Sequence, residues 1–189
     1  MAERAAWHDE GVDDRALVDA VLAGDRDLFR VLVEREQAGI YRTCLRILGR
    51  LHDAEDVAQE SFVMAYRSLG SYRGDGPLGG WLRRIAIRQA YRRLGQRRES
   101  VELQPDLLLS ARGSDPSAVI LAGERQRAVR LAVASLGEPY REVVALRFFA
   151  EMSLKEIATT TRRPLNTVKT HLRRGLERLR PLIGREGMA

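Results

Sequence analysis

The chain has 189 residues, of which 44% are hydrophobic and 31% are charged, and its formal net charge is +6. This size allows one ordinary hydrophobic core or two small ones, and the basic charge favours a polyanionic partner, most often a nucleic acid. The only cysteine, Cys44, excludes a disulfide framework and makes a zinc site implausible, so we expect a small core residue there.

The sequence shows neither a signal peptide nor a run of about 20 apolar residues that could span a membrane. We therefore expect a cytoplasmic protein. Apolar residues recur at spacings of three and four, and alternating β-branched runs are missing, which predicts an all-α fold.

In the first half of the chain, the apolar pattern predicts four helices, over residues 14–22, 28–48, 53–69 and 81–98. Asp53 is expected to be the N-cap of the third helix, with Asp56 three residues later in an acidic variant of the capping box. Residues 70–80 contain five glycines and a proline, which predicts a loop before the fourth helix.

The composition changes after this fourth helix, where residues 99–118 are rich in acids and prolines and have little periodicity. We interpret this segment as a flexible linker between two small helical domains, and we expect a disordered tail at the N-terminus. The predicted organisation is a tail (1–13), a first domain (14–98), a linker (99–118) and a second domain (119–185).

The second domain contains the most specific motif, EMSLKEIATTTRRPLNTVKTHLRR. Ser153 and Glu156 are spaced as a capping box at the start of a short helix, and a longer basic helix is expected from about Asn166. Its buried side is predicted to carry Val168, Leu172, Leu176 and Leu179. A short helix, a tight turn and a longer basic helix form the pattern of a helix-turn-helix.

The opposite side of the longer helix carries polar residues that would face a DNA major groove together. Arginine pairs bidentately with guanine, and each good pair contributes about 1–3 kcal/mol of discrimination. Four arginines near the helix ends are expected to contact phosphates, which positions the protein without reading sequence: Arg162, Arg163, Arg178 and Arg180. The alternative is that this is an exposed charged helix of an ordinary bundle. We expect His171 to be another surface contact rather than a catalytic or metal-binding group.

The fourth predicted helix carries seven arginines and no acid between residues 81 and 98. Such a stretch repels itself unless an anion arrives, and a nucleic acid would supply one. Tyr72, Trp81 and Tyr91 could stack on unpaired bases, although Trp81 also continues the apolar stripe and fits a core position.

Taken together, the segments DAEDVAQESF, YRGDGPLGGWLRRIA and the helix-turn-helix motif resemble the extracytoplasmic-function sigma factors. These are two-domain, sigma-70-type specificity subunits of bacterial RNA polymerase, and the resemblance runs from about Asp14 to Ile183. It implies a protein that recognises minus-35 and minus-10 promoter elements and promotes transcription initiation. The partners that it implies are core RNA polymerase, promoter DNA (as duplex and as melted nontemplate strand) and an anti-sigma factor. It implies no enzymatic activity, no cofactor and no metal.

The resemblance also assigns roles to individual residues. The acidic helix is implied to bind polymerase, because its outer face combines carboxylates with an apolar patch: Asp53, Asp56, Gln59, Glu60 and Val63. Its inner face is expected to carry Val57, Ala58, Phe62, Ala65 and Tyr66. The alternative, a solvated acidic helix start favoured by the helix dipole, explains Asp53 and Glu55 well but Asp56, Gln59 and Glu60 less well.

The loop over residues 70–80 is implied to capture a base flipped from the minus-10 element, together with the arginine helix. The residues implied to bind minus-10 DNA are Tyr72, Arg73, Trp81, Arg84, Arg88 and Arg92. Many members of the family carry Asn and Asp where this chain has Arg88 and Arg92. The residues implied to bind minus-35 DNA are Asn166, Thr167, Lys169, Thr170, Arg173 and Arg174.

Three other functions are compatible with parts of the sequence. A conventional helix-turn-helix regulator would usually dimerise on a two-fold operator. A sigma-like decoy would occupy an anti-sigma factor without initiating transcription. A metal-dependent nuclease would use Asp53, Asp56 and Glu60, but these acids lack His or Cys partners at metal-ligand spacing.

Overall fold

The computed structural model describes residues 13–99 and 116–183. This part of the chain is helical and contains no strand, which confirms the predicted all-α class there. The first range forms α2 (Asp14–Leu22), α3 (Arg26–Leu48), α4 (Leu51–Ser68), the short 3-10 helix η2 (Leu69–Ser71) and α5 (Leu78–Glu99). The second range forms α6 (Pro116–Ser135), α7 (Tyr140–Phe148), α8 (Leu154–Thr161) and α9 (Leu165–Ile183).

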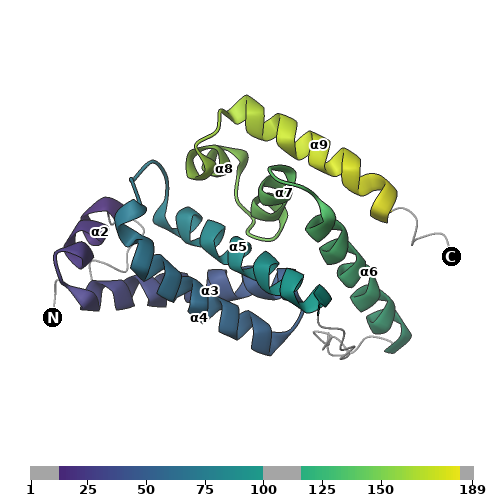
Figure 1. Ribbon diagram of the computed structural model, residues 1–189, viewed down its shortest axis with the longest axis horizontal. Coiled ribbons are helices and arrows are strands. Elements are labelled where there is room, and N and C mark those ends of the chain that lie inside the picture. Colours follow the sequence, from purple (N-terminus) through teal and green to yellow (C-terminus); the bar gives the residue numbers. More distant parts are fainter. Residues whose placement is uncertain (1–12, 100–115, 184–189) are drawn as a thin grey trace.

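The helices form two groups that touch each other. Helices α3, α4 and α5 pack side by side with α2 at one end, while α6 to α9 form the second group (Figure 1). Helix α5 contacts both α7 and α8 and is therefore the main element of the first group that meets the second. The predicted tail and most of the predicted linker lie outside the described residues, but the ends of that linker, residue 99 and residues 116–118, are helical.

The start of α4 differs from the expected one. Asp53 is not the N-cap, because the helix already begins at Leu51 after Arg50. Gly49 ends α3 in the left-handed conformation, with φ of 75°, and its N–H bonds back to the carbonyl of Leu45. This glycine cap reverses the chain within two residues, so α4 starts earlier than its acidic residues suggest.

Helix α5 also begins earlier than expected, at Leu78 rather than Trp81. The backbone N–H of Leu78 donates to Oδ2 of Asp14 at 2.7 Å, and Oδ1 of the same carboxylate pairs with Arg35 at 2.7 Å. Asp14 thus caps a helix that starts 64 residues further along the chain. The local run of glycines could not reveal a cap that arrives from another element.

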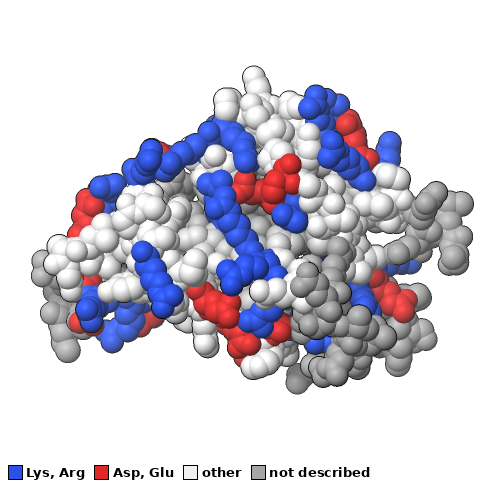
Figure 2. Space-filling view, viewed as in Figure 1, with Lys and Arg blue, Asp and Glu red and all other residues white. Residues whose placement is uncertain are grey.

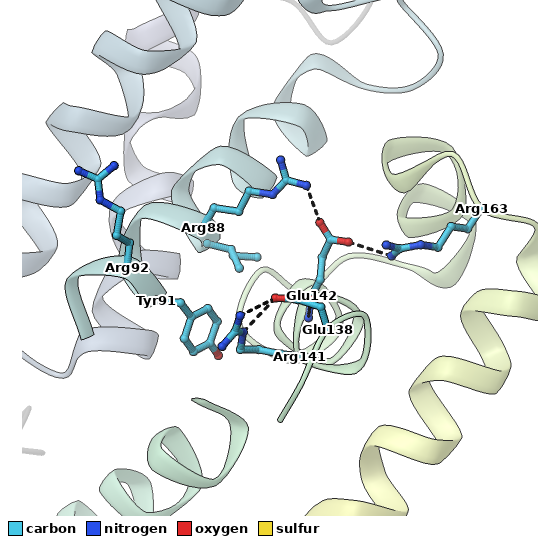
Figure 3. A pocket seen from close by; sticks show the side chains of 8 residues that line it. Arg88, Tyr91, Arg92, Glu138, Arg141, Glu142 and Arg163 are labelled. Carbon is cyan, nitrogen blue, oxygen red and sulfur yellow. Dashed lines mark hydrogen bonds and ion pairs between the residues drawn. The ribbon is translucent and has the colours of Figure 1, made fainter. Parts of the chain in front are cut away.

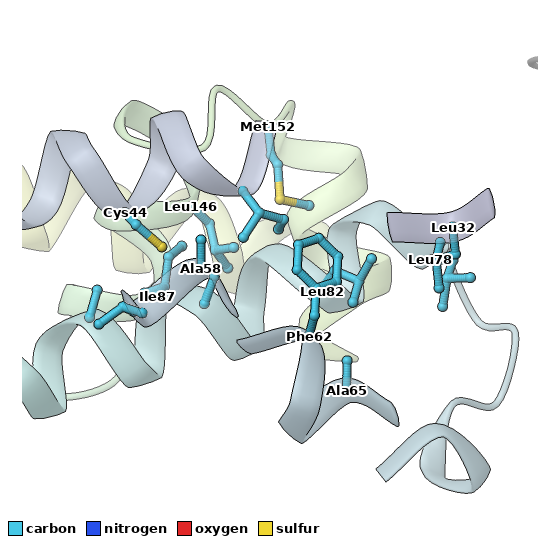
Figure 4. Packing of buried hydrophobic residues seen from close by; sticks show 14 of the residues in the cluster. Leu32, Cys44, Ala58, Phe62, Ala65, Leu78, Leu82, Ile87, Leu146 and Met152 are labelled. Carbon is cyan, nitrogen blue, oxygen red and sulfur yellow. The ribbon is translucent and has the colours of Figure 1, made fainter. Parts of the chain in front are cut away.

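The buried core extends across both groups of helices (Figure 4). Leu82 of α5 and Leu146 of α7 belong to the same apolar cluster as Cys44 of α3. Cys44 is fully buried, as expected, and burial raises the pKa of its thiol to about 12. The two helical groups are therefore joined by apolar packing as well as by polar contacts.

Two residues expected on inner faces are exposed instead. Tyr66 is 42% exposed and packs edge-on against the ring of Phe29, with 4.9 Å between ring centroids. Leu176 is also 42% exposed, because the adjacent Gly175 makes the close contact of α9 with α7. A Cβ atom at Gly175 would lie 2.8 Å from Val144, so only glycine allows this approach.

Candidate nucleic-acid and protein interfaces

The predicted helix-turn-helix is confirmed as α8, a tight turn and α9. The Ser153 hydroxyl accepts the N–H of Glu156 at 3.2 Å, and the Glu156 carboxylate accepts the N–H of Ser153 at 2.7 Å, which confirms the capping box. These hydrogen bonds from Ser153 lower the pKa of the Glu156 carboxyl. Arg162 ends α8 in the left-handed conformation, with φ of 55°, and this turn fixes the angle between the two helices.

Helix α9 presents its predicted reading residues to solvent. Val168 is fully buried and Leu179 is 4% exposed, so the apolar side of the helix faces α6 to α8. On the outer side, Arg173 pairs only with the exposed Glu177 one turn away. The residues assigned to minus-35 DNA are exposed or half-exposed: Asn166, Thr167, Lys169, Thr170, Arg173 and Arg174.

Three of the four arginines expected to contact phosphates are engaged inside the protein. Arg162 pairs with Asp75 at 2.8 Å, and Arg163 pairs with Glu142 at 2.8 Å. The guanidinium of Arg178 lies 4.1 Å from the centre of the Tyr140 ring. In this arrangement of the two helical groups, two acids and one aromatic ring of the protein itself engage these side chains, although Arg162 and Arg178 remain exposed.

His171 is half-buried on α9, and its ring packs edge-on against Tyr140 at 5.7 Å between ring centroids. Burial lowers the pKa of His171, and the charges of Arg163 and Arg174 lower it further. The side chain therefore favours the neutral form. In the part of the chain that the structure describes, no group of three His, Cys, Asp or Glu side chains is placed to hold a metal ion.

The arginines of α5 have carboxylate partners that the sequence of the helix itself does not contain. Arg83 pairs with Glu36 of α3 at 3.5 Å, and Arg93 pairs with Glu60 of α4 at 3.0 Å. The prediction that this helix repels itself until an external anion arrives is therefore wrong for these residues. The compensating acids come from other helices, and only the fold reveals them.

Glu142 of α7 pairs with three arginines within the described residues. Its carboxylate is only 6% exposed and pairs with Arg84 at 2.7 Å, with Arg88 at 3.2 Å and with Arg163 at 2.8 Å (Figure 3). Burial raises the pKa of this carboxyl, but hydrogen bonds and charges of Arg84 and Arg163 outweigh it, so the pKa lies below its usual value. The sequence analysis did not identify Glu142, and no local signal marks it.

A cleft of about 450 Å³ lies beside Glu142, between α5 and α7. Arg88 and Arg163 reach the carboxylate from two sides of this cleft, whereas Arg92, which also lines the cleft, points away from the carboxylate (Figure 3). Arg141 pairs with Glu138 at 2.8 Å and extends over the ring of Tyr91. The lining therefore carries more arginines than acids.

The glycine-rich loop before α5 is packed against the helix-turn-helix. A Cβ atom at Gly76 of this loop would lie 2.9 Å from the hydroxyl of Thr159 in α8, and one at Gly80, in the first turn of α5, would lie 2.6 Å from the hydroxyl of Thr160. Tyr72 is buried, and its hydroxyl donates to the carbonyl of Gly76 at 2.6 Å. Burial, followed by the nearby acids of α2, raises the pKa of Tyr72 to about 12. Trp81 lies 5.8 Å from Tyr72 between ring centroids and is half-buried.

The six residues assigned to minus-10 DNA thus fall into three environments. Tyr72 and Trp81 pack in the loop, and Arg84 and Arg88 hold Glu142. Arg73 and Arg92 are exposed. Arg88 is also largely exposed, but its guanidinium is held by Glu142, so Arg73 and Arg92 are the two of the six that are both exposed and outside these contacts.

The acidic face of α4 forms a second candidate interface. Four of its five predicted residues line one hollow of about 460 Å³, which α5 completes: Asp56, Gln59, Glu60 and Val63. Asp53 does not join them, because it is 7% exposed and lies 3.6 Å from Arg93. Val63 is 49% exposed and adds an apolar contact to the hollow. Figure 2 shows acidic side chains on the α4 side of a band of basic side chains over α5.

Comparison with known proteins gives two family matches in this chain. The model of sigma-70 region 2 matches residues 32–99, and the model of sigma-70 region 4 matches residues 126–179. The ECF RNA polymerase sigma factor SigW of Bacillus subtilis is 31% identical over 173 residues, covering 86% of this chain and 92% of that protein.

Two solved structures share the fold. One is CnrH in complex with the cytosolic domain of CnrY, with a TM-score of 0.60 and 23% identity, covering 92% of this chain and 98% of that one. The other is the sigma factor RpoE in complex with the anti-sigma factor NepR from Bartonella quintana, with a TM-score of 0.53 and 18% identity, covering 82% of this chain and 96% of that one. In the ranges 13–99 and 116–183, no helix of this chain is long and apolar enough to cross a membrane.

Proposed function

Because the chain belongs to the extracytoplasmic-function sigma factors, we propose that it binds bacterial core RNA polymerase, recognises minus-35 and minus-10 promoter elements and promotes transcription initiation. The observation that carries this proposal is the presence of both sigma-70 matches in one chain, with the second match on a helix-turn-helix whose basic side is exposed. A conventional helix-turn-helix regulator would not require a region 2 domain in addition to its DNA-binding domain.

Helix α9 is the element that enters the major groove of the minus-35 duplex in this proposal. Lys169 and Arg174 project from its exposed side, and Arg173 has only an exposed partner on the same helix, so all three reach DNA without unfolding the domain. Arginine reads guanine through two hydrogen bonds, whereas lysine contacts one phosphate or base as a point charge.

The minus-10 element is bound along α5 and the loop before it. Arg73 and Arg92 are exposed here and provide the first phosphate contacts on the melted nontemplate strand. The hydroxyl of Tyr72 and the ring of Trp81 give the loop its shape, and a flipped base would need this loop to separate from α8. Base capture is therefore linked to a movement of the two helical groups.

Core polymerase binds the α4 hollow in this proposal. The carboxylates of Asp56 and Glu60 and the apolar Val63 lie together there, so the matching surface of the polymerase offers basic and apolar groups. The protein acts in the cytoplasm, where it meets polymerase, and contributes no catalysis of its own. An anti-sigma factor is a further partner, which is supported by the likeness to a sigma factor solved with one.

The experiment separates the two interfaces by single substitutions in run-off transcription with purified core polymerase. Arg174→Ala should lose about 1–3 kcal/mol of binding at one minus-35 position and leave core binding unchanged. Asp56→Ala should weaken core binding and leave promoter preference unchanged. Matched controls are Arg30→Ala and Glu34→Ala, which remove the same charges from an exposed pair on α3.

Two results would contradict these roles. If the Arg174→Ala protein transcribes from every minus-35 variant as the wild type does, Arg174 is not one of the residues that read the minus-35 sequence. Sequence-specific binding of a two-fold duplex by the protein without polymerase would favour a conventional regulator instead.

A further inference from the structure

The contact between the two helical groups centres on one buried carboxylate. Glu142 comes from α7, Arg84 and Arg88 come from α5, and Arg163 comes from the turn before α9. One carboxylate cannot neutralise three guanidinium groups, so the cluster retains positive charge. Removing this carboxylate alone would be costly, because it would leave several charges without a partner.

Two further contacts hold the same two groups together. Arg162 of the turn pairs with Asp75 of the glycine-rich loop at 2.8 Å, and both side chains are half exposed. Arg46 of α3 pairs with Glu151 of the segment after α7 at 2.9 Å. The Arg162–Asp75 pair and the close approach of Gly76 to Thr159 cover part of the loop that the proposed function assigns to base capture.

The arginine partners of Glu142 are residues that are expected to contact promoter DNA. Arg84 and Arg88 were assigned to minus-10 DNA, and Arg163 was expected to contact a phosphate. A guanidinium binds a carboxylate and a phosphate through the same planar pair of N–H donors. Glu142 therefore occupies the place that a DNA phosphate would take.

We propose that Glu142 is an internal latch that keeps the free protein closed, with its carboxylate in a phosphate-binding site formed by Arg84, Arg88 and Arg163. The proposal rests on the proposed function, since it names DNA phosphates as the competing ligand. Opening of the latch frees three guanidinium groups from the carboxylate, of which only that of Arg88 is already largely exposed at 62%, and uncovers the loop before α5. Free protein therefore binds DNA weakly, and separation of the two helical groups makes it competent.

The test uses the full chain and the variant Glu142→Gln, which keeps the shape of the side chain and removes its charge. The matched control is Glu138→Gln, which removes the same charge from the same cleft but affects contacts inside the second helical group alone, namely the pair with Arg141 and the hydrogen bond that Glu138 accepts from the backbone N–H of Glu142. The probe is a fluorescein-labelled DNA duplex of random sequence, without polymerase. Binding is measured by fluorescence anisotropy at several salt concentrations, and the radius of gyration is measured by small-angle X-ray scattering.

We expect Glu142→Gln to bind the duplex at least fivefold more tightly than Glu138→Gln at about 0.1 M salt, because three phosphate contacts become available. The plot of the logarithm of the DNA-association constant against the logarithm of the salt concentration should have a slope steeper by about 2–3, because each freed arginine adds about 0.9. The radius of gyration should rise for Glu142→Gln and not for Glu138→Gln. Equal slopes and equal radii for the two variants would overturn the proposal.

A second variant keeps the proposal testable if Glu142→Gln loses helix in circular dichroism. Asp75→Arg breaks an exposed contact between the groups and places two like charges together, so it should also raise DNA affinity and the radius of gyration. The double variant Asp75→Arg with Arg162→Asp restores the ion pair with its charges exchanged. It should return the DNA affinity and the radius of gyration toward the wild-type values. An Asp75→Arg protein as compact and as weakly binding as wild type would count against the latch.

Run-off transcription by the wild-type protein distinguishes the latch from the proposed function. A wild-type protein that gives no transcripts with core polymerase contradicts the proposed function. Promoter-specific transcripts together with an unchanged salt slope for Glu142→Gln contradict the latch alone.

Discussion

The cap that Asp14 provides for α5 yields a prediction that can be worked from the structure. The Asp14 carboxylate accepts the N–H of Leu78 and pairs with Arg35, and both charged side chains are only about one-fifth exposed, at 23% and 21%. Helix α5 has no acid in its own first turn, so Asp14 is also the negative charge nearest the positive end of its dipole.

Asp14→Ala should destabilise the protein by about 2 kcal/mol. Losing an N-cap side chain costs about 1 kcal/mol, and losing a half-buried ion pair adds up to about 1 kcal/mol. For a chain of this size, 1 kcal/mol corresponds to about 2–4 °C, so the midpoint of thermal unfolding should fall by about 4–8 °C.

The assay is thermal unfolding followed by circular dichroism, with Asp19→Ala as the control. Asp19 pairs with Arg15 on the same helix, and its side chain is 54% exposed, so its loss should change stability by less than about 0.5 kcal/mol. Equal midpoints for Asp14→Ala and Asp19→Ala would refute the account of how α5 begins.

The other predictions concern single side chains. Ser153→Ala removes one half of the capping box and should lower the free energy of unfolding by about 1 kcal/mol in urea titration, and an unchanged midpoint would contradict this. Cys44, with a pKa raised to about 12, stays a neutral buried thiol at pH 8 and should react with a thiol reagent only after denaturation; rapid reaction in the native state would contradict its burial. The Glu142 carboxyl has a pKa below its usual 4.5, so its stabilising contribution is complete above pH 4.5 and disappears as pH falls through the lower native value. Unfolding between pH 3 and 6 should therefore depend less on pH in Glu142→Gln than in wild type, and identical pH profiles would contradict this.

The helical pattern was predictable because it depends on local chemistry. The spacing of Ser153 and Glu156 fixes a capping box wherever the rest of the chain lies, and the apolar spacing of α9 fixes which side of it is exposed. Cys44 was predictable for the same reason, because its neighbours form an apolar helical stripe. The exposed residues assigned to the minus-35 element follow directly from these patterns.

The parts that could not be predicted depend on contacts between distant segments. Asp14 extends α5 by a turn from another helix, and Gly49 moves the start of α4 away from Asp53. Glu142 is one glutamate among many in the sequence, and only the packing of α7 against α5 gives it three arginine partners, including Arg163. Residue type alone therefore identified the basic residues of the site but not the acid that binds them.

The most direct test of the proposed function is run-off transcription with purified core RNA polymerase and a pooled genomic template, with and without this protein. Discrete new start sites that share two upstream elements, one near minus-35 and one near minus-10, are the predicted result. A protein that neither binds core polymerase nor changes the transcripts would contradict the account.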